Sequence, residues 1–263
     1  MRTNTGGVIN YTNNAYGVAY IHEDEKIKMG NSNGWYAGAV TNRFRFKDIG
    51  RSRENQTMIK AGLFKKISPS FDHNGSLTWK ISGETFAGHS DMKRKYWIVN
   101  KSYEAKGNYS TYGVSLKNEI EKNFRLSQRT SISSFGALNL EYGRYTNIKE
   151  TGPMALEAKG NDYYSIKPEA GISFNFKQPL GERGNLKVNL VTSYENELGK
   201  LNNVQNEIKL RNTKVGYYKL QGDKEDRKGN TKFNLNVGVE NIRFGITANI
   251  GYETKGKNVK GGI

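Results

Sequence analysis

Residues 164–177 read YSIKPEAGISFNFK, an unbroken alternation of apolar and polar side chains. The first set of alternate positions is apolar: Tyr164, Ile166, Pro168, Ala170, Ile172, Phe174 and Phe176. The second set is charged, polar or small: Ser165, Lys167, Glu169, Gly171, Ser173, Asn175 and Lys177. Successive side chains of a strand point to opposite faces, so the segment predicts a β-strand with one apolar and one polar face. It is longer than the roughly 5–6 residues usual in soluble proteins.

The same alternation recurs along most of the chain and predicts an all-β fold. No segment keeps the helical period of 3.6, so little helix is expected. We predict about twelve strands, near residues 14–24, 33–47, 56–67, 76–90, 107–120, 130–146, 162–177, 185–197, 212–220, 230–239, 242–252 and 258–263.

Between the strands lie two kinds of connection. Clusters of Gly, Asn, Asp and Pro predict turns, and a very short turn is expected near Glu240. The clusters lie at 68–75, 177–185, 222–230 and 255–258. Longer polar stretches predict loops at 88–106, 147–161 and 199–211. Short turns on one rim and long loops on the other are typical of outer-membrane barrels.

Composition narrows the membrane alternatives. The chain has 263 residues, no cysteine, three histidines and a mean hydropathy of −0.77. No run approaches the ~18 apolar residues of a spanning helix, which excludes a helical membrane protein. A barrel strand needs only alternate apolar residues, so a barrel remains compatible. The net charge of +16 is spread over nearly every segment, which favours lumen and loop lysines over nucleic-acid binding. Basic loops also suit contact with anionic lipid head groups.

Three features favour a membrane barrel over a soluble β-sandwich. Aromatic residues lie near strand ends, the polar face is rich in glycine and in both charges, and the strands are long. In lipid the sheet must close, because unpaired edge groups cost several kcal/mol each. We therefore expect one domain over residues 1–263, a monomeric transmembrane antiparallel up-and-down β-barrel of about twelve strands, the last incomplete.

The polar face supplies the candidate pore lining. Its charged members are expected to pair across a wet lumen, and its glycines to leave room for a helix or chain. The candidates are Lys167, Glu169, Gly171, Lys187, Glu195, Gly238, Glu240, Arg243, Gly245, Gly251 and Glu253. Glu195, Glu197 and Glu240 are also weighed as acid–base carboxylates, but lysine or arginine pairing is favoured. No catalytic or nucleotide-binding motif is found, so no enzyme, cofactor or metal site is expected.

Several stretches resemble one family in order along the chain. They are NNAYGVAYIHEDEKIKMGNSNGWYAGAVTNRF at 13–44, YGVSLKNEIE at 112–121, EYGRYTNIKE at 141–150, GNDYYSIKPEAGISF at 160–174, YENELGK at 194–200 and FNLNVGVENIRFGITANIGYETKGKNVKGGI at 233–263. These residues are similar to the autotransporter β-domains of large fusobacterial surface proteins. The resemblance implies a translocator barrel of type V secretion in the outer membrane of a Gram-negative bacterium. Its partners would be outer-membrane lipids, its own passenger and linker, and the barrel-assembly machinery, with no nucleic acid.

The family's pattern also differs from this chain at both ends. The family's last strand continues beyond the position of Ile263, and a passenger and a pore helix precede its first strand. The opening residues 1–14 lack a signal-peptide core. We therefore expect a fragment or the product of an interrupted gene. Two alternatives stay open: a stand-alone outer-membrane pore or adhesin, and a soluble basic β-protein that binds polyanions.

Overall fold

The computed structural model describes residues 11–26, 31–72, 75–181, 184–199, 206–220, 229–241, 245–254 and 258–262, and this part of the chain contains strands and connections only. No helix in it is long and apolar enough to cross a membrane. The strands are Tyr11–Lys26 (β1), Asn31–Phe46 (β2), Arg53–Asp72 (β3), Gly75–Ile98 (β4), Lys101–Arg125 (β5), Thr130–Tyr145 (β6), Ile148–Lys149 (β7), Leu156–Ala158 (β8), Asn161–Leu180 (β9), Gly184–Glu195 (β10), Asn206–Leu210 (β11), Tyr218–Leu220 (β12), Asn230–Asn241 (β13), Gly245–Glu253 (β14) and Asn258–Gly262 (β15).

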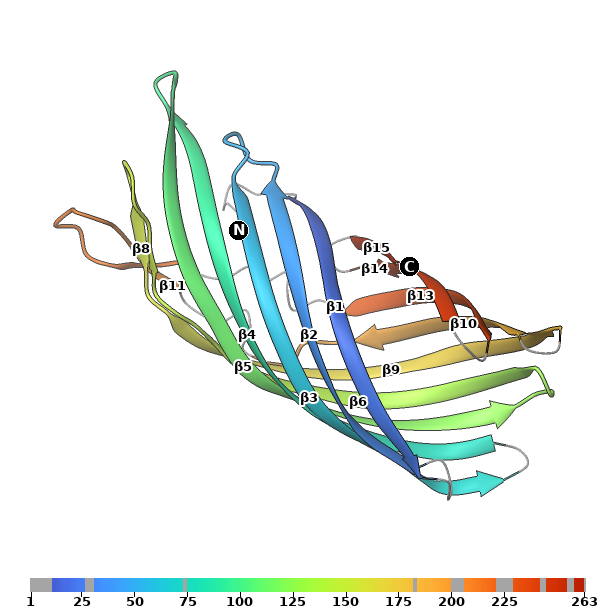
Figure 1. The fold of residues 1–263 in the computed structure, drawn as a ribbon. Helices are drawn as coiled ribbons and strands as arrows, with labels where there is room; N and C mark the ends of the chain where they lie inside the picture. Colours follow the sequence, from blue (N-terminus) through green and yellow to red (C-terminus); the bar gives the residue numbers. More distant parts are fainter. Residues whose placement is uncertain are drawn as a thin grey trace.

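Eleven strands form one large sheet in the order β1-β2-β3-β4-β5-β6-β9-β10-β13-β14-β15, and every neighbouring pair is antiparallel. The sheet curls into a deep trough (Figure 1). Over the residues described, no backbone pairing joins β1 to β15. With eleven antiparallel strands these two edges run in the same direction, whereas a fully antiparallel barrel closes with an even number.

Most of the predicted strands are confirmed, and one is wrong. Eleven of the predicted ranges correspond to strands of the large sheet, although residues 242–244 and 263 lie outside the described residues. The predicted strand at 212–220 does not join that sheet; only Tyr218–Leu220 is extended, in a separate small sheet. The predicted turns at 222–230 and 255–258 lie largely outside the described residues.

The loop predicted at 88–106 is also wrong. β4 continues to Ile98, and β5 begins at Lys101 after a two-residue turn in which Val99 and Asn100 have φ of 42° and 63°. The pair forms the tall hairpin of Figure 1. Residues 88–106 have charged side chains such as Asp91, Lys93 and Lys95 on the convex face, which is apolar elsewhere, so they lack the alternation that marks a strand in lipid. Backbone pairing nevertheless continues through them.

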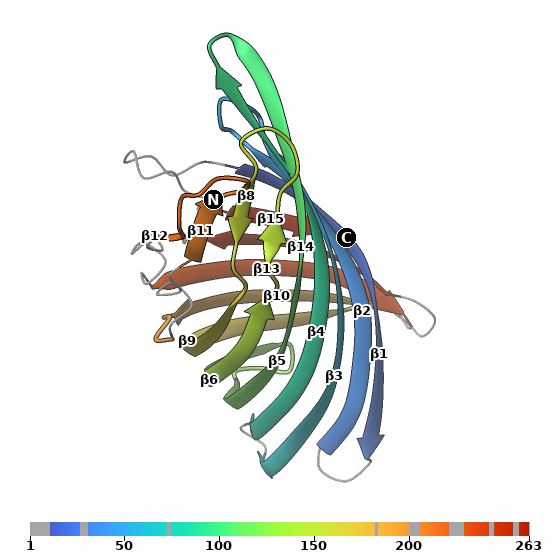
Figure 2. The ribbon, with the colours of Figure 1, turned by 90° about the vertical axis from the view of Figure 1, so that its left-hand side faces the viewer.

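A second, four-stranded sheet has the order β12-β11-β8-β7, and we call it the rim sheet. It occupies segments predicted as the loops 147–161 and 199–211, so these loops are partly structured. Figures 1 and 2 place it at one end of the trough, beside β4 and β5. We call this the loop end, since segments 47–52, 99–100 and 146–160 also lie there; segment 126–129 lies at the opposite turn end.

The large sheet exposes apolar side chains on one face and buries polar side chains on the other, which is the reverse of a soluble protein. Large apolar side chains are exposed on one face; Val18 is 80% and Leu63 is 70% accessible. Polar side chains are buried on the other, among them Ser32, Thr78, Ser90, Thr111, Ser133, Ser165, Ser173 and Ser193. Side chains crowd on the concave side of a curled sheet and spread on its convex side. The apolar face is therefore convex and the polar face concave.

Candidate pore lining

Strand register places the predicted pore-lining positions on one face. Residues directly opposite each other in paired strands project to the same side. Ten of the candidates pair in this way with one another or with polar neighbours: Lys167 with Asn139, Glu169 with Glu195, Gly171 with Ser193, Lys187 with Gly238, Glu240 with Gly245, Gly251 with Asn234 and Glu253 with Lys232. Arg243 lies outside the described residues. That these positions line a pore remains a prediction.

Lys232 of β13 is the centre of a charge cluster on this face. Its Nζ lies 2.6 Å from Glu195 Oε2 and 3.5 Å from Glu169 Oε1. Ser193 Oγ donates to Glu169 at 2.6 Å, and Asn230 Nδ2 donates to Glu195 at 3.1 Å. Sequence reasoning missed Lys232, although it shares the parity of Asn234 and Gly238 on the predicted polar face. Extending that alternation by one position would have found it.

The carboxylates that were weighed for acid–base chemistry each lie beside a lysine, as the pairing interpretation predicts. Lys187 Nζ is 2.6 Å from Glu240 Oε2, and Lys167 Nζ is 3.9 Å from Glu197 Oε2. Glu197 is only 6% exposed and also accepts hydrogen bonds from a serine hydroxyl and two backbone N–H groups, those of Ser165, Ile166 and Gly199. Its carboxylate thereby fixes the chain where it leaves β10.

The charged lining continues around the trough onto β2–β5, where the sequence analysis named no candidates. Lys60 Nζ and the Tyr36 hydroxyl both donate to Glu84, at 2.9 and 2.8 Å. Lys80 Nζ lies 3.0 Å from Glu119 and 2.5 Å from Glu121. Acids and bases thus alternate across neighbouring strands. Such a face can hydrogen-bond water or a polar chain while most of its charges are neutralised within the protein.

Aromatic rings fill much of the space beside the concave glycines. A Cβ at Gly171 would lie 2.5 Å from the Phe135 ring. At Gly238 and Gly251 the neighbours are Thr247 Oγ1 and Asn234 Oδ1, at 2.6 and 2.5 Å. Side chains of neighbouring strands thus occupy the space next to these three glycines, and room for a guest chain in the lumen stays a prediction. Further ring-over-glycine pairs are Tyr36 with Gly62, Phe64 with Gly34, Phe86 with Gly113 and Tyr163 with Gly143.

Glu150 attaches the rim sheet to the loop end of the concave face. It is 1% exposed, and Arg94 of β4 binds it through Nε at 3.0 Å and Nη2 at 2.6 Å. Its second oxygen also accepts the Leu156 N–H at 2.8 Å, and its carbonyl accepts from Arg211 at 2.7 Å. The Glu150 carboxylate therefore joins β4 to the β7–β8 turn, and the Glu150 carbonyl adds the end of β11.

Partly exposed polar contacts hold the rim sheet together laterally. The Tyr217 hydroxyl donates to Glu157 at 3.0 Å and keeps the pKa of that carboxyl below its usual value. Lys159 Nζ lies 2.6 Å from Glu207 Oε2, and this contact lowers the pKa of Glu207. Because they are partly exposed to water, each of these contacts is expected to contribute little to stability.

A curled, all-antiparallel sheet with an exposed apolar convex face and a charged concave face defines the transmembrane β-barrel class. Within that class the chain belongs to the autotransporter family: the Autotransporter beta-domain profile matches residues 1–250. The fold is similar to the beta domain of the Bordetella autotransporter BrkA, with 11% identity, a TM-score of 0.60 and coverage of 95% of this chain and 88% of that one.

It is also similar to the translocator domain of the autotransporter NalP from Neisseria meningitidis, with 13% identity, a TM-score of 0.55 and coverage of 95% and 78%. A search of curated protein sequences gave no match. At these identities the two structures establish the fold alone. They support the predicted β-barrel architecture, whereas the exact strand count of a closed barrel stays a prediction.

Proposed function

We propose that this chain is the translocator of a type V secretion system in the outer membrane of a Gram-negative bacterium. In this role the barrel anchors an N-terminal passenger and helps to export it to the cell surface. The observation that carries the proposal is the inverted sheet: apolar outside, charged inside, in a chain of the autotransporter β-domain family.

The two faces suit the two tasks of such a domain. The convex face presents exposed apolar side chains such as Leu140 and Ile172 to lipid tails, where they are favourable. The concave face presents the ion pairs around Lys232 and Glu84, together with buried serines, to the lumen. A passing polypeptide needs partners for its own N–H and C=O groups, which water and these side chains provide. The task requires no catalytic residue.

The proposed partners follow from the same arrangement. The convex face is in contact with outer-membrane lipids, and the lumen is in contact with the linker of the chain's own passenger. Insertion of a sheet with so much exposed apolar surface requires protection from water, a task that suits the barrel-assembly machinery. We propose a monomeric barrel.

The test is export of a reporter. The chain, preceded by a secretory signal and a small folded reporter through a flexible linker, is produced in a Gram-negative host. Export predicts that a protease added to intact cells removes the reporter. A matched variant, Leu140→Arg, places a charge on the convex face and is expected to abolish surface display.

Two outcomes distinguish a translocator from a stand-alone pore or adhesin. Loss of display in Leu140→Arg, with display by the parent, supports a membrane-inserted translocator. A parent chain that inserts, as judged by heat-modifiable gel mobility, yet leaves the reporter in the periplasm contradicts export and favours a stand-alone pore or adhesin.

A further inference from the structure

A row of cations crosses the convex face near the loop end. Strand pairing aligns Thr12 of β1 with Arg45, Arg45 with Arg53, Arg53 with Lys93, and Lys93 with Lys106. Directly paired residues share a face, so four neighbouring strands each contribute one positive charge to the same row. All four cationic side chains are exposed. We call Arg45, Arg53, Lys93 and Lys106 the basic row.

The basic row lies beyond the edge of the lipid-facing apolar surface. Six residues further along the same strands, the convex row is Val18, Ala39, Ile59, Ala87 and Tyr112. Six residues span about 20 Å of strand, or roughly 15 Å of height at a barrel's tilt. Two polar rows lie between them. The row beside the basic row is Asn14, Arg43, Asn55, Asp91 and Asn108, and the next is Tyr16, Thr41, Thr57, His89 and Ser110. The basic row therefore lies at head-group height when the apolar row is in lipid.

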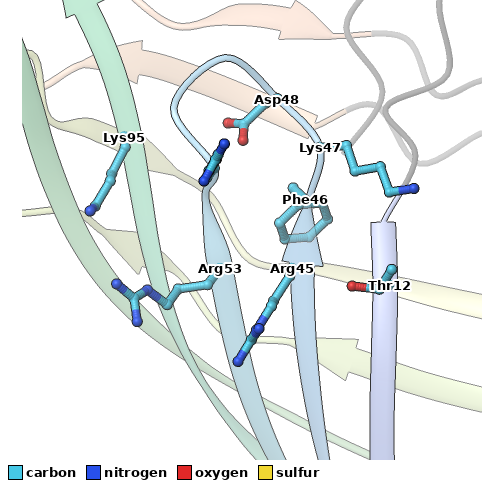
Figure 3. Close-up of a pocket in the computed structure, with 8 residues that line it drawn as sticks. Thr12, Arg45, Phe46, Lys47, Asp48, Arg53 and Lys95 are labelled. Carbon is cyan, nitrogen blue, oxygen red and sulfur yellow. The ribbon is translucent and has the colours of Figure 1, made fainter.

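These charges are poorly neutralised by the protein itself. Across the described ranges, Arg45, Arg53 and Lys93 form no ion pair, whereas Lys106 lies 3.5 Å from Glu104. A depression of about 690 Å³ adjoins the row and brings Lys47, Arg51 and Lys95 close to Arg45 and Arg53. In Figure 3 the Arg45 and Arg53 side chains extend side by side from adjacent strands.

The acid in this depression is already engaged. Both carboxylate oxygens of Asp48 accept hydrogen bonds from Ser52, from its backbone N–H at 2.6 Å and from its hydroxyl at 2.5 Å. Asp48 thus closes the β2–β3 turn. Of the five cations around it, Lys95 lies 3.9 Å from Glu104 Oε2, and the other four form no ion pair within the described ranges, so a positive field remains. Two guanidinium groups on adjacent strands suit the oxygens of a phosphate, because each can bind such oxygens bidentately.

We propose that the basic row and the adjoining depression bind the phosphate groups of an anionic glycolipid in the outer leaflet. This inference rests on the proposed insertion in the membrane. The position at head-group height on the lipid-facing side argues for a lipid phosphate, because a soluble phosphate has no reason to prefer that height. The bound lipid would fix the vertical position of the barrel and seal the loop end of β2–β5.

The test measures binding of one defined lipid to the full chain folded in zwitterionic vesicles. The probe is bisphosphorylated lipid A, compared with lipid A from which both phosphates have been removed. The variant is Arg45→Ser with Arg53→Ser. The matched control is Arg125→Ser with Arg129→Ser, which removes two exposed arginines at the turn end. We expect the first variant to lose roughly tenfold or more in apparent affinity, and the control to bind as the parent does.

The outcomes separate this inference from the proposed function. Failure of the parent chain to gain heat-modifiable mobility in vesicles overturns both. Insertion followed by equal lipid A binding in parent and Arg45→Ser/Arg53→Ser overturns only the phosphate surface. Equal binding of phosphorylated and dephosphorylated lipid A by the parent chain also overturns the phosphate surface and leaves the proposed function standing. If millimolar inorganic phosphate displaces lipid A completely, the site prefers free phosphate and the lipid assignment is wrong.

Discussion

The large sheet and the rim sheet are both antiparallel, yet they are stabilised in different ways. Strands of the large sheet reach 25 residues, and long backbone ladders hold them side by side. Rim-sheet strands have two to five residues, too few for an independently stable sheet. Their position depends on side chains, above all on Glu150. Backbone pairing and an apolar face therefore specify the trough, whereas a few polar contacts specify the rim.

The largest expected effect concerns the convex face of the large sheet. Leu140→Arg places a charge among apolar neighbours and is expected to destabilise the folded state by about 2–4 kcal/mol near the midplane. Ala137→Arg, three residues away on the concave face, pairs across strands with Glu119 and Glu169 and should be tolerated. Urea unfolding in lipid vesicles, followed by gel mobility, measures both. Equal destabilisation of the two variants would contradict the assignment of faces.

A smaller and more local effect is expected from Glu150→Ala. The variant leaves the guanidinium of Arg94 half-buried without its carboxylate, at a cost of about 3 kcal/mol. The loss should detach the rim sheet and leave the trough folded. Limited proteolysis in vesicles is expected to cut within 147–160 while gel mobility stays heat-modifiable. If the variant is cut within 147–160 and also loses its heat-modifiable mobility, the two sheets form one cooperative unit.

Within the trough, Lys232→Met tests the concave cluster. Removing the ammonium leaves Glu169 and Glu195 facing each other, at a cost of about 2 kcal/mol. Lys177→Met is the matched control, since Lys177 is also concave and has no acidic partner among the residues described. Urea unfolding should show a lower free energy of unfolding for Lys232→Met than for Lys177→Met. If both variants change the free energy of unfolding by a negligible amount, water in the lumen screens the charges of the cluster.

The smallest effect is a pH dependence of the rim sheet. Contacts with Tyr217 and Lys159 lower the folded pKa values of Glu157 and Glu207 below their unfolded values. Their stabilisation is therefore complete above about pH 4.3 and is lost as pH falls through the folded pKa values. A spin label at Asn212 should gain mobility in that acidic window. The double variant Glu157→Gln/Glu207→Gln should be mobile already at neutral pH; retained acid dependence in it would assign the titration to other groups.

Sequence reasoning located the trough because lipid imposes a strict pattern on its strands. Alternation over 164–177 or 233–239 needs no tertiary information. Where the strands leave the apolar zone, as in residues 88–106, the convex positions become charged and the alternation disappears, although backbone pairing continues. The rim sheet is harder to predict from the sequence than the trough. The contact that attaches it joins Arg94 to Glu150, which are 56 positions apart and belong to no periodic pattern.

For the candidate pore lining, the sequence could predict which positions share a face but not which side chains contact one another. Parity placed Lys187, Glu195 and Glu240 together, and register agrees. Parity could not reveal that Lys232 bridges two glutamates or that Phe135 covers Gly171, because both depend on cross-strand neighbours. Choosing those neighbours requires the register, which the sequence alone leaves open.

The central claim is that the convex face meets lipid and the concave face meets water. Because the chain has no cysteine, single cysteines can be placed at successive positions 135–142 of β6 and spin-labelled in vesicles. Collision rates with oxygen, which concentrates in lipid, and with a water-soluble nickel chelate are then compared at each site. The account predicts a period of two, with oxygen favoured at even positions such as Leu138 and Leu140 and nickel favoured at odd positions such as Ala137 and Asn139. The opposite phase, or no alternation, would contradict it.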